Sequence, residues 1–198
     1  MNKLKENLEK NRFSVYFAKS SSEALELAKT FFKDISSVGL GGSTSVTQIG
    51  LLDYILEQKN LTVFNQYEKG IDMSENLNRR RKGLLADLYV TGCNAITKNG
   101  ELVNADGSGN RVAAQIFGPK KVLLIVGKNK IVATLKDGFD RITNIAAIKN
   151  INRMNNKAKQ MGKEPKYNLE NIANKFAYIN GDVEGRTHII IVNEELGF

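Results

Sequence analysis

The stretch Thr91-Gly-Cys-Asn-Ala-Ile-Thr-Lys-Asn-Gly-Glu-Leu-Val-Asn-Ala-Asp-Gly-Ser-Gly-Asn-Arg111 decides how the fold is interpreted. It follows an apolar run, residues 88–90, that is typical of a buried strand. Asn99-Gly100 between two short β-like runs predicts a hairpin turn with positive φ at both central positions. A second glycine-rich turn, residues 106–109, precedes a helical pattern. Because open α/β sheets bind ligands at the ends of their strands, this stretch predicts a binding site.

Strand-like and helix-like segments alternate along the rest of the chain. An alternating pattern predicts a strand at residues 13–18, and apolar runs predict strands at 37–40, 61–64, 88–90, 122–126 and 188–192. A period of 3.6 residues predicts helices at 4–12, 20–32, 43–58, 73–85, 112–117 and 134–152. The continuous apolar runs indicate strands buried on both faces of a parallel sheet. The pattern therefore predicts one α/β domain over residues 1–198, with three layers and a mostly parallel sheet.

Two segments stand outside this alternation. Residues 1–12 are expected to form an N-terminal helix that precedes the first strand. Residues 153–185 are polar and low in apolar content, so we expect a variable excursion, with a short helix around 169–175.

Composition limits the partners. The net charge is +8, from 29 Lys and Arg against 21 Asp and Glu, which favours a small anionic metabolite as ligand. Nucleic acid is not expected, because no aromatic platform accompanies the one basic cluster at residues 79–82. That cluster is either a solvated helix face or an electropositive rim of the pocket.

The chain carries no feature that predicts export or membrane insertion. Its N-terminus is charged, and no apolar run approaches the roughly 20 residues that span a bilayer. One cysteine excludes a disulfide framework and leaves too few thiols for a structural zinc site. We therefore expect a cytoplasmic protein without a membrane or metal partner.

The first candidate ligand-binding motif is a glycine turn between a strand and a helix. Such a turn lets the backbone approach a ligand, and the first helical amides and hydroxyls hold an anion. It matches neither a Walker loop nor the dinucleotide fingerprint. In the alternative interpretation, a hydroxyl of this turn merely caps the helix. The candidate residues are Gly41, Gly42, Ser43, Thr44 and Ser45.

The second candidate motif is the stretch quoted first. Asp106 can hold a ligand hydroxyl, or it can cap the following helix. Arg111 can clamp a carboxylate or phosphate, or it can brace the turn through a salt bridge. Both alternatives remain open for each residue. The candidate ligand-binding residues here are Gly92, Asn94, Asn104, Asp106, Gly107, Gly109, Asn110 and Arg111.

No catalytic residue is assigned, but Cys93, Asn94 and Glu194 are candidates. A reactive thiolate needs a base or a positive field nearby. The single histidine, His188, lies in an apolar strand, so we favour an inert buried thiol and a packed histidine, although a Cys–His pair stays open. Glu194 either faces the pocket from a strand end or is solvated.

Residues 87–127 resemble the core of the lactate-utilisation (LUD) domain family. The matching motifs are Thr-Gly-x-Asn-Ala-Ile-Thr, then Asn-Gly-x-Leu-Val-Asn-x-Asp-Gly-x-Gly-Asn-Arg-Val, then Phe-Gly-Pro-Lys-Lys-Val, and the similarity extends over residues 14–198. The resemblance implies a fold like that of sugar-phosphate isomerases and CoA-transferases. It also implies an accessory role in an iron–sulfur system that oxidises lactate to pyruvate, with binding between the Gly41 turn and the Asn94–Arg111 turns.

The chain departs from related patterns at positions that carry chemistry. Methylthioribose-phosphate isomerases carry an acidic residue and a lysine where this sequence has Asn94 and Ala105. An amide does not exchange protons near neutral pH, so isomerase chemistry is not expected. The alternative function is nevertheless a stand-alone enzyme that acts on a phosphorylated sugar or an acyl-CoA.

Several members that the chain resembles carry a cysteine cluster between the long helix and the final strand. Residues 153–185 contain no cysteine here, so no cofactor is expected on this chain. Any iron–sulfur centre would belong to a partner redox subunit. A homodimer is a further partner that the sequence leaves open.

Overall fold

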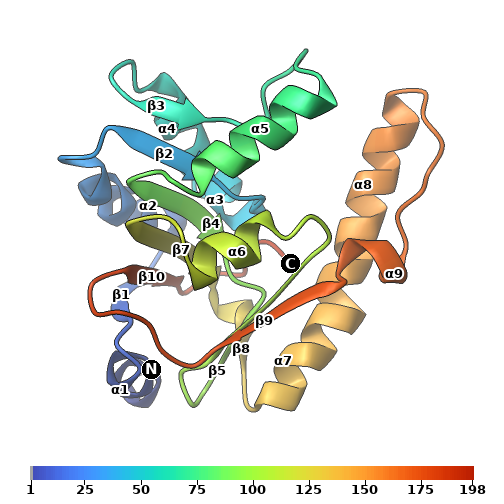
Figure 1. Cartoon of the computed structure of the whole chain (residues 1–198). Helices are drawn as coiled ribbons and strands as arrows, with labels where there is room; N and C mark the ends of the chain where they lie inside the picture. Colours follow the sequence, from blue (N-terminus) through green and yellow to red (C-terminus); the bar gives the residue numbers. More distant parts are fainter. Residues whose placement is uncertain (1) are drawn as a thin grey trace.

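A six-stranded parallel sheet forms the body of the computed structural model, which describes residues 2–198 (Figure 1). Every strand pair in this sheet is parallel. The central strands are buried on both faces, which explains their continuous apolar sequences. The order is β1 (Ser14–Ala18), β10 (Thr187–Val192), β7 (Lys121–Gly127), β4 (Leu88–Gly92), β2 (Ser37–Leu40), β3 (Thr62–Phe64).

Helices cover both faces of this sheet, so the α/β prediction with three layers is confirmed. One core cluster joins the sheet to α2 (Ser21–Lys29), α3 (Thr44–Gln48) and α4 (Leu51–Glu57). The cluster on the opposite face joins it to α1 (Asn2–Lys10) and α6 (Asn110–Ile116). Near this second face, α5 (Met73–Gly83) packs against β2 and β3. A short 3₁₀ turn, η1 (Thr30–Phe32), follows α2.

The helix predicted at residues 43–58 is wrong as a single element. Gly50 adopts a left-handed φ of 78° and separates α3 from α4. The apolar side chains on both sides of the break still reach the same core cluster, which is why their period suggested one continuous helix.

A second, four-stranded sheet was only partly foreseen. Its order is β8 (Ile131–Val132), β5 (Ala95–Thr97), β6 (Leu102–Asp106), β9 (Lys175–Ile179), with β6 antiparallel to both neighbours. The predicted hairpin is β5–β6, but its turn does not have the positive φ that was expected at both Asn99 and Gly100. Gly100 has a φ of 86° and no other residue of the turn has a positive φ, which matches a three-residue loop. The sequence did not predict β8, which has two residues and follows η2 (Lys128–Lys130), or β9.

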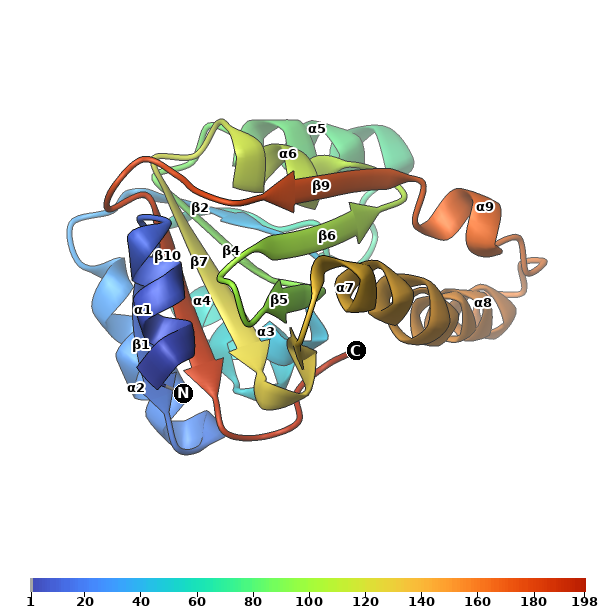
Figure 2. The same cartoon turned by 90° about the horizontal axis from the view of Figure 1, so that it is seen from below.

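The helix predicted at residues 134–152 is longer than expected. It comprises α7 (Leu135–Arg141), a π-helical segment η3 (Ile142–Ala147) and α8 (Ile148–Gln160), followed by the short α9 (Leu169–Ile172). Figures 1 and 2 show this helical arm standing to one side of the large sheet. In the predicted excursion at 153–185, α9 agrees with the short helix expected around 169–175, whereas the end of α8 and the strand β9 were not predicted. The low apolar content of this segment reflects a helix without a fully buried side chain.

A substitution in the hairpin turn tests the contact between this turn and α1. A methyl group on Gly100 would lie 2.7 Å from the carbonyl carbon of Asn7 in α1. Gly100→Ala should therefore combine a left-handed backbone penalty of about 1–2 kcal/mol with a clash of about 1–3 kcal/mol. Gly70→Ala is the matched control, because Gly70 has a φ of 85° and open space around it. In urea denaturation, we expect Gly100→Ala to lose clearly more unfolding free energy than Gly70→Ala. Equal losses would show that α1 does not contact the turn.

Candidate functional site

A cavity of about 650 Å³ lies at the carboxyl ends of β2 and β4. After β2 the chain moves outward to β3, whereas the strand that pairs with β4 on its other side is β7. The chain therefore leaves these two paired strands in opposite directions along the sheet, which is where doubly wound sheets open a crevice for ligands. Residues that follow β2, β4, β6 and β7 form one side of the cavity, and the helical arm forms the other.

Both glycine-rich motifs reach this cavity. The predicted residues that line it are Gly42, Ser43, Thr44, Gly92, Cys93, Asn94, Asp106, Gly107, Asn110 and Arg111. The predicted residues outside the lining are Gly41, Ser45, Asn104, Gly109 and Glu194. Whether the lining residues contact a ligand stays a prediction.

The turn after β2 is held by its own hydrogen bonds. A methyl group on Gly41 would lie 2.4 Å from Oγ1 of Thr91, so only glycine fits this close approach to β4. Ser43 Oγ accepts a hydrogen bond from the backbone N–H of Val46 and caps α3. The Ser43 N–H donates to the hydroxyl of Tyr67. Ser43 thus follows the capping alternative, while Gly42 and Thr44 remain at the cavity.

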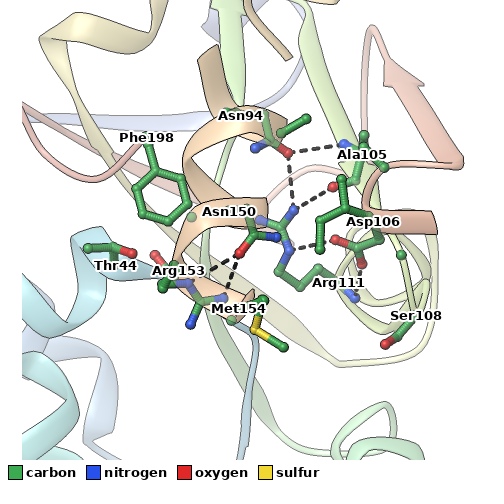
Figure 3. Close-up of a pocket in the computed structure, with 18 of the residues that line it drawn as sticks. Thr44, Asn94, Ala105, Asp106, Ser108, Arg111, Asn150, Arg153, Met154 and Phe198 are labelled. Carbon is green, nitrogen blue, oxygen red and sulfur yellow. Dashed lines mark hydrogen bonds and ion pairs between the residues drawn. The ribbon is translucent and has the colours of Figure 1, made fainter. Parts of the chain in front are cut away.

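Arg111 is the centre of the opposite motif (Figure 3). Its Nε donates to Asp106 Oδ1 at 2.7 Å, and its Nη2 donates to the carbonyl of Ala105 at 2.7 Å and to Asn94 Oδ1 at 3.1 Å. Burial opposes its charge, but the charge of Asp106 and their hydrogen bonds outweigh this, so the pKa of Arg111 is raised. Arg111 therefore braces the turn. Its Nη1 has no hydrogen-bond partner within residues 2–198, and the residue lines the cavity.

Asp106 follows the helix-capping alternative. Its second carboxylate oxygen, Oδ2, accepts from the backbone N–H groups of Arg111 at 2.8 Å and Val112 at 3.2 Å, at the start of α6. Both oxygens thus have partners inside the protein. The carboxylate compensates the Arg111 charge, and it needs no ligand hydroxyl to satisfy it.

Asn94 and Asn104 have different positions. Asn104 Oδ1 accepts from the Asn94 backbone N–H, and its Nδ2 donates to Gln115, so this fully buried side chain is structural. Asn94 Oδ1 accepts from the backbone N–H of Ala105 and from Arg111. These contacts fix the amide orientation and leave Asn94 Nδ2 without a partner among residues 2–198, in a side chain at the cavity (Figure 3).

Cys93 and His188 do not form a pair. The Cys93 thiol is buried and donates to the carbonyl of Ala95 at 3.0 Å, and burial raises its pKa. His188 lies near the start of β10, two strands from β4, with its ring 4.8 Å from that of Phe31. The favoured interpretation of an inert thiol and a packed histidine agrees with these positions.

Glu194 lies away from the cavity. Its carboxylate accepts a hydrogen bond from the Ser21 hydroxyl at 2.5 Å, at the start of α2. Of the two alternatives for Glu194, the one in which it faces the pocket is therefore wrong, because its hydrogen bond with Ser21 directs the carboxylate toward α2.

Sequence reasoning missed Lys130, which lines the cavity just after β7. Only 3% of the residue is exposed, and its Nζ donates to Ser45 Oγ at 2.9 Å. Burial, together with the charges of Arg141 and Arg111, lowers the pKa of Lys130 to about 7, while Cys93 opposes the shift. The strand-end rule offered a signal, because Lys130 follows an apolar parallel strand at the same sheet edge.

The arm also contributes side chains that were not foreseen. Residues spaced three or four apart on η3 and α8 share one helix face. This spacing in the sequence could have indicated that they line one surface together. Arg153 Nε and Nη2 donate to Asn150 Oδ1 at 3.2 and 2.7 Å, as Figure 3 shows. The lining residues from the arm are Ile142, Ala146, Ala147, Asn150, Arg153, Met154 and Lys157.

The basic cluster at residues 79–82 is partly a solvated helix face and partly a rim of the cavity. Arg79 forms ion pairs with Glu68 and Glu75, and Arg81 and Lys82 are exposed. Arg80 instead lines the cavity, where its Nη1 donates to Ser108 Oγ at 2.9 Å. Its Nε is buried and has no partner within residues 2–198.

The cavity is therefore electropositive. Its lining includes Arg80, Arg111, Arg153, Lys157 and the partly charged Lys130, against the single acidic side chain of Asp106, which is paired with Arg111. Like charges that converge on one crevice focus a positive potential and attract anions. The arrangement is suited to a carboxylate or a phosphate.

The donor set does not fit an iron–sulfur cluster. Cys93 is buried and already hydrogen-bonded, and residues 153–185 contain no cysteine. Among residues 2–198, no three His, Cys, Asp or Glu side chains gather in a way that would hold a metal ion. None of the described helices has both the length and the apolarity to cross a membrane.

Comparisons with known proteins agree with this architecture. A family model described as the LUD domain matches residues 1–192. The crystal structure of a DUF162 family protein from Deinococcus radiodurans is similar over 97% of this chain and 95% of that chain, with a TM-score of 0.54 and 14% sequence identity. At this identity, the likeness concerns the fold alone. No curated protein matches the chain.

The buried amine makes stability depend on pH. The pKa of Lys130 is about 7 in the folded protein against an ordinary 10.5, so between these values the unfolded chain binds more protons. The unfolding free energy should therefore rise with pH across this window, by at most about 1.4 kcal/mol per pH unit, and the gain is lost as pH falls toward 7. Lys130→Met should remove this rise.

Urea denaturation between pH 7 and pH 10 measures the effect. Lys128→Met is the matched control, because Lys128 is exposed and lies two residues earlier. We expect the control to follow the wild-type pH profile and Lys130→Met to diverge from it. Parallel profiles for all three proteins would show that Lys130 is not buried as a neutral amine.

Proposed function

The chain belongs to the LUD domain family, and we propose that it binds a small anionic metabolite in the cavity as an accessory component of lactate utilisation. The observation that carries the proposal is the charge of the lining, where three arginines, Lys157 and the partly charged Lys130 face one acidic side chain that is already paired. The volume of about 650 Å³ suits a small metabolite. The family supplies the metabolic context.

The unpartnered donors indicate where an anion would bind. Arg111 Nη1 and Asn94 Nδ2 belong to side chains that share a hydrogen bond, so they approach the cavity from one direction. Arg80 and Arg153 lie in the lining on α5 and α8. Charge-assisted hydrogen bonds from guanidinium groups are strong and are well matched to carboxylates. Lactate and pyruvate are the ligands that the family context suggests.

The accessory role follows from the thiol content. Oxidation of a 2-hydroxy acid removes two electrons, which an acceptor must receive. Iron–sulfur clusters are held by cysteine thiolates, and this chain has one cysteine, which is buried. We therefore assign the acceptor to a partner redox subunit.

A cationic cavity also suits a phosphate group, so a stand-alone enzyme that acts on a phosphorylated sugar or an acyl-CoA is the second candidate. The isomerase version of this candidate lacks its acid–base residues, because Asn94 and Ala105 occupy those positions. The class of ligand that binds distinguishes the two candidates.

A thermal-shift screen tests the proposal. The ligands are lactate, pyruvate, sugar phosphates, nucleotides and coenzyme A. A ligand at 100 times its dissociation constant adds about 2.7 kcal/mol of stability, which at this chain length raises the Tm by roughly 5–10 °C. We expect lactate or pyruvate to produce such a shift. A shift with phosphorylated compounds alone would favour the enzyme, and no shift at all would contradict anion binding by this chain.

Asn94→Asp tests the location of the site. The substitution is isosteric and keeps an oxygen that accepts from Ala105 and Arg111, but it replaces the unpartnered N–H donors with a second carboxylate oxygen. We expect the affinity for the anion found in the screen to fall at least tenfold, about 1.4 kcal/mol, in isothermal titration calorimetry.

Asn60→Asp is the matched control, because it adds the same charge at an exposed position outside the cavity. Its affinity should equal that of the wild type. An unchanged affinity in Asn94→Asp would place the anion elsewhere.

A further inference from the structure

Lys130 is an amine that the fold buries at the cavity without a counter-ion. Its Nζ has one hydrogen-bond partner, Ser45 Oγ, and it forms no ion pair within residues 2–198. A lysine that only packs against its neighbours extends its charged end into water. Burial of an unpaired ammonium is unfavourable, so such a group is normally neutral or functional.

The groups around Lys130 favour the neutral amine. Arg111 on α6 and Arg141 on α7 are the charged groups that face it, and both are positive. The Cys93 thiol after β4 has a raised pKa and remains uncharged near neutral pH. On the remaining sides lie the Ser45 hydroxyl and Gly197, where an added methyl group would lie 3.1 Å from Nζ. With a pKa of about 7, a large share of the amine carries a free electron pair at neutral pH.

We propose that Lys130 is a nucleophile that forms an imine with the carbonyl carbon of a 2-oxo acid bound in the cavity. The proposal rests on the anion binding proposed above and names its substrate class. Arg111 Nη1 and Asn94 Nδ2 are donors for the carboxylate of such a ligand. The adjacent carbonyl carbon then offers an electrophile to the amine, whereas a 2-hydroxy acid offers none.

The step balances without an oxidant or a reductant. The Lys130 nitrogen bonds to the carbonyl carbon, the C=O π bond breaks, and an amine proton moves to the oxygen to give a carbinolamine. The hydroxyl then takes up a proton from solvent and leaves as water, which breaks the C–O bond and leaves a protonated imine on the Lys130 nitrogen. Ser45 Oγ accepts a hydrogen bond from Nζ at 2.9 Å, so it positions the amine, and its hydroxyl is next to the atom on which the carbinolamine forms.

Reductive trapping tests the proposal on the full chain. The protein is incubated with pyruvate or glyoxylate and sodium cyanoborohydride, and its peptides are mapped by mass spectrometry. We expect a reduced adduct at Lys130 that forms at least tenfold faster than at Lys128, which is exposed and serves as the control within the same protein. The adduct in the peptide that contains position 130 should disappear in Lys130→Met, and the adduct at Lys130 should persist in Lys128→Met.

The pH profile separates a buried neutral amine from an ordinary lysine. Labelling of Lys130 should level off above about pH 7.5, where its amine is already neutral. Labelling of Lys128 should continue to rise toward pH 10, because an exposed lysine has a pKa of about 10.4. Profiles of the same shape at both positions would count against the proposal.

Calorimetry without the reductant distinguishes failure of this inference from failure of the proposed function. Pyruvate that binds but gives no selective adduct at Lys130 with either oxo acid overturns the imine and leaves anion binding in place. If no carboxylate binds and no adduct forms, both proposals fail. The wild-type peptide map decides the outcome even if Lys130→Met does not fold.

Discussion

The buried ion pair between Arg111 and Asp106 is the constraint on which the site depends. It connects the end of β6 to the start of α6, and through Asn94 it reaches the end of β4, so it ties the small sheet to the large one at the cavity. Removal of one member would leave a buried charge, at a cost of about 3–5 kcal/mol. Anion recognition and the stability of the fold therefore depend on the same guanidinium group. A substitution of Asn94 should change anion recognition with less effect on stability.

The parts of the structure that local pattern determines were predictable. Apolar runs, and an alternating pattern at residues 13–18, located the six strands of the large sheet, and the Asn99-Gly100 turn located the β5–β6 hairpin. The two glycine-rich motifs could be placed at one cavity because parallel strands share their carboxyl edge. The alternatives for Asp106 and Ser43 could not be separated from sequence, since a hydroxyl or carboxylate that caps a helix and one that holds a ligand occupy the same kind of position.

The missed features depend on contacts between distant segments. Lys130 is buried because α3, α7 and the residues around Gly197 close over it, and nothing in its own neighbourhood of sequence distinguishes it from Lys128. The end of α8, residues 153–160, was mistaken for part of an excursion because α8 has no fully buried side chain and carries few apolar residues. Its π-helical segment, η3, shifts the face that reaches the cavity, and no local signal marks such a segment.

Convergence of cations in one crevice has an electrostatic consequence for the ligand. Arg111 is compensated by Asp106 and Lys130 by loss of its proton, so the empty cavity already limits its own repulsion. A bound carboxylate adds negative charge, which favours the ammonium form of Lys130 and thus opposes its nucleophilicity. A protonated imine resolves this conflict, because it keeps the positive charge beside the carboxylate after the amine has reacted. The same charges that attract a 2-oxo acid would therefore stabilise the product of its reaction with Lys130 more than the neutral complex that precedes it.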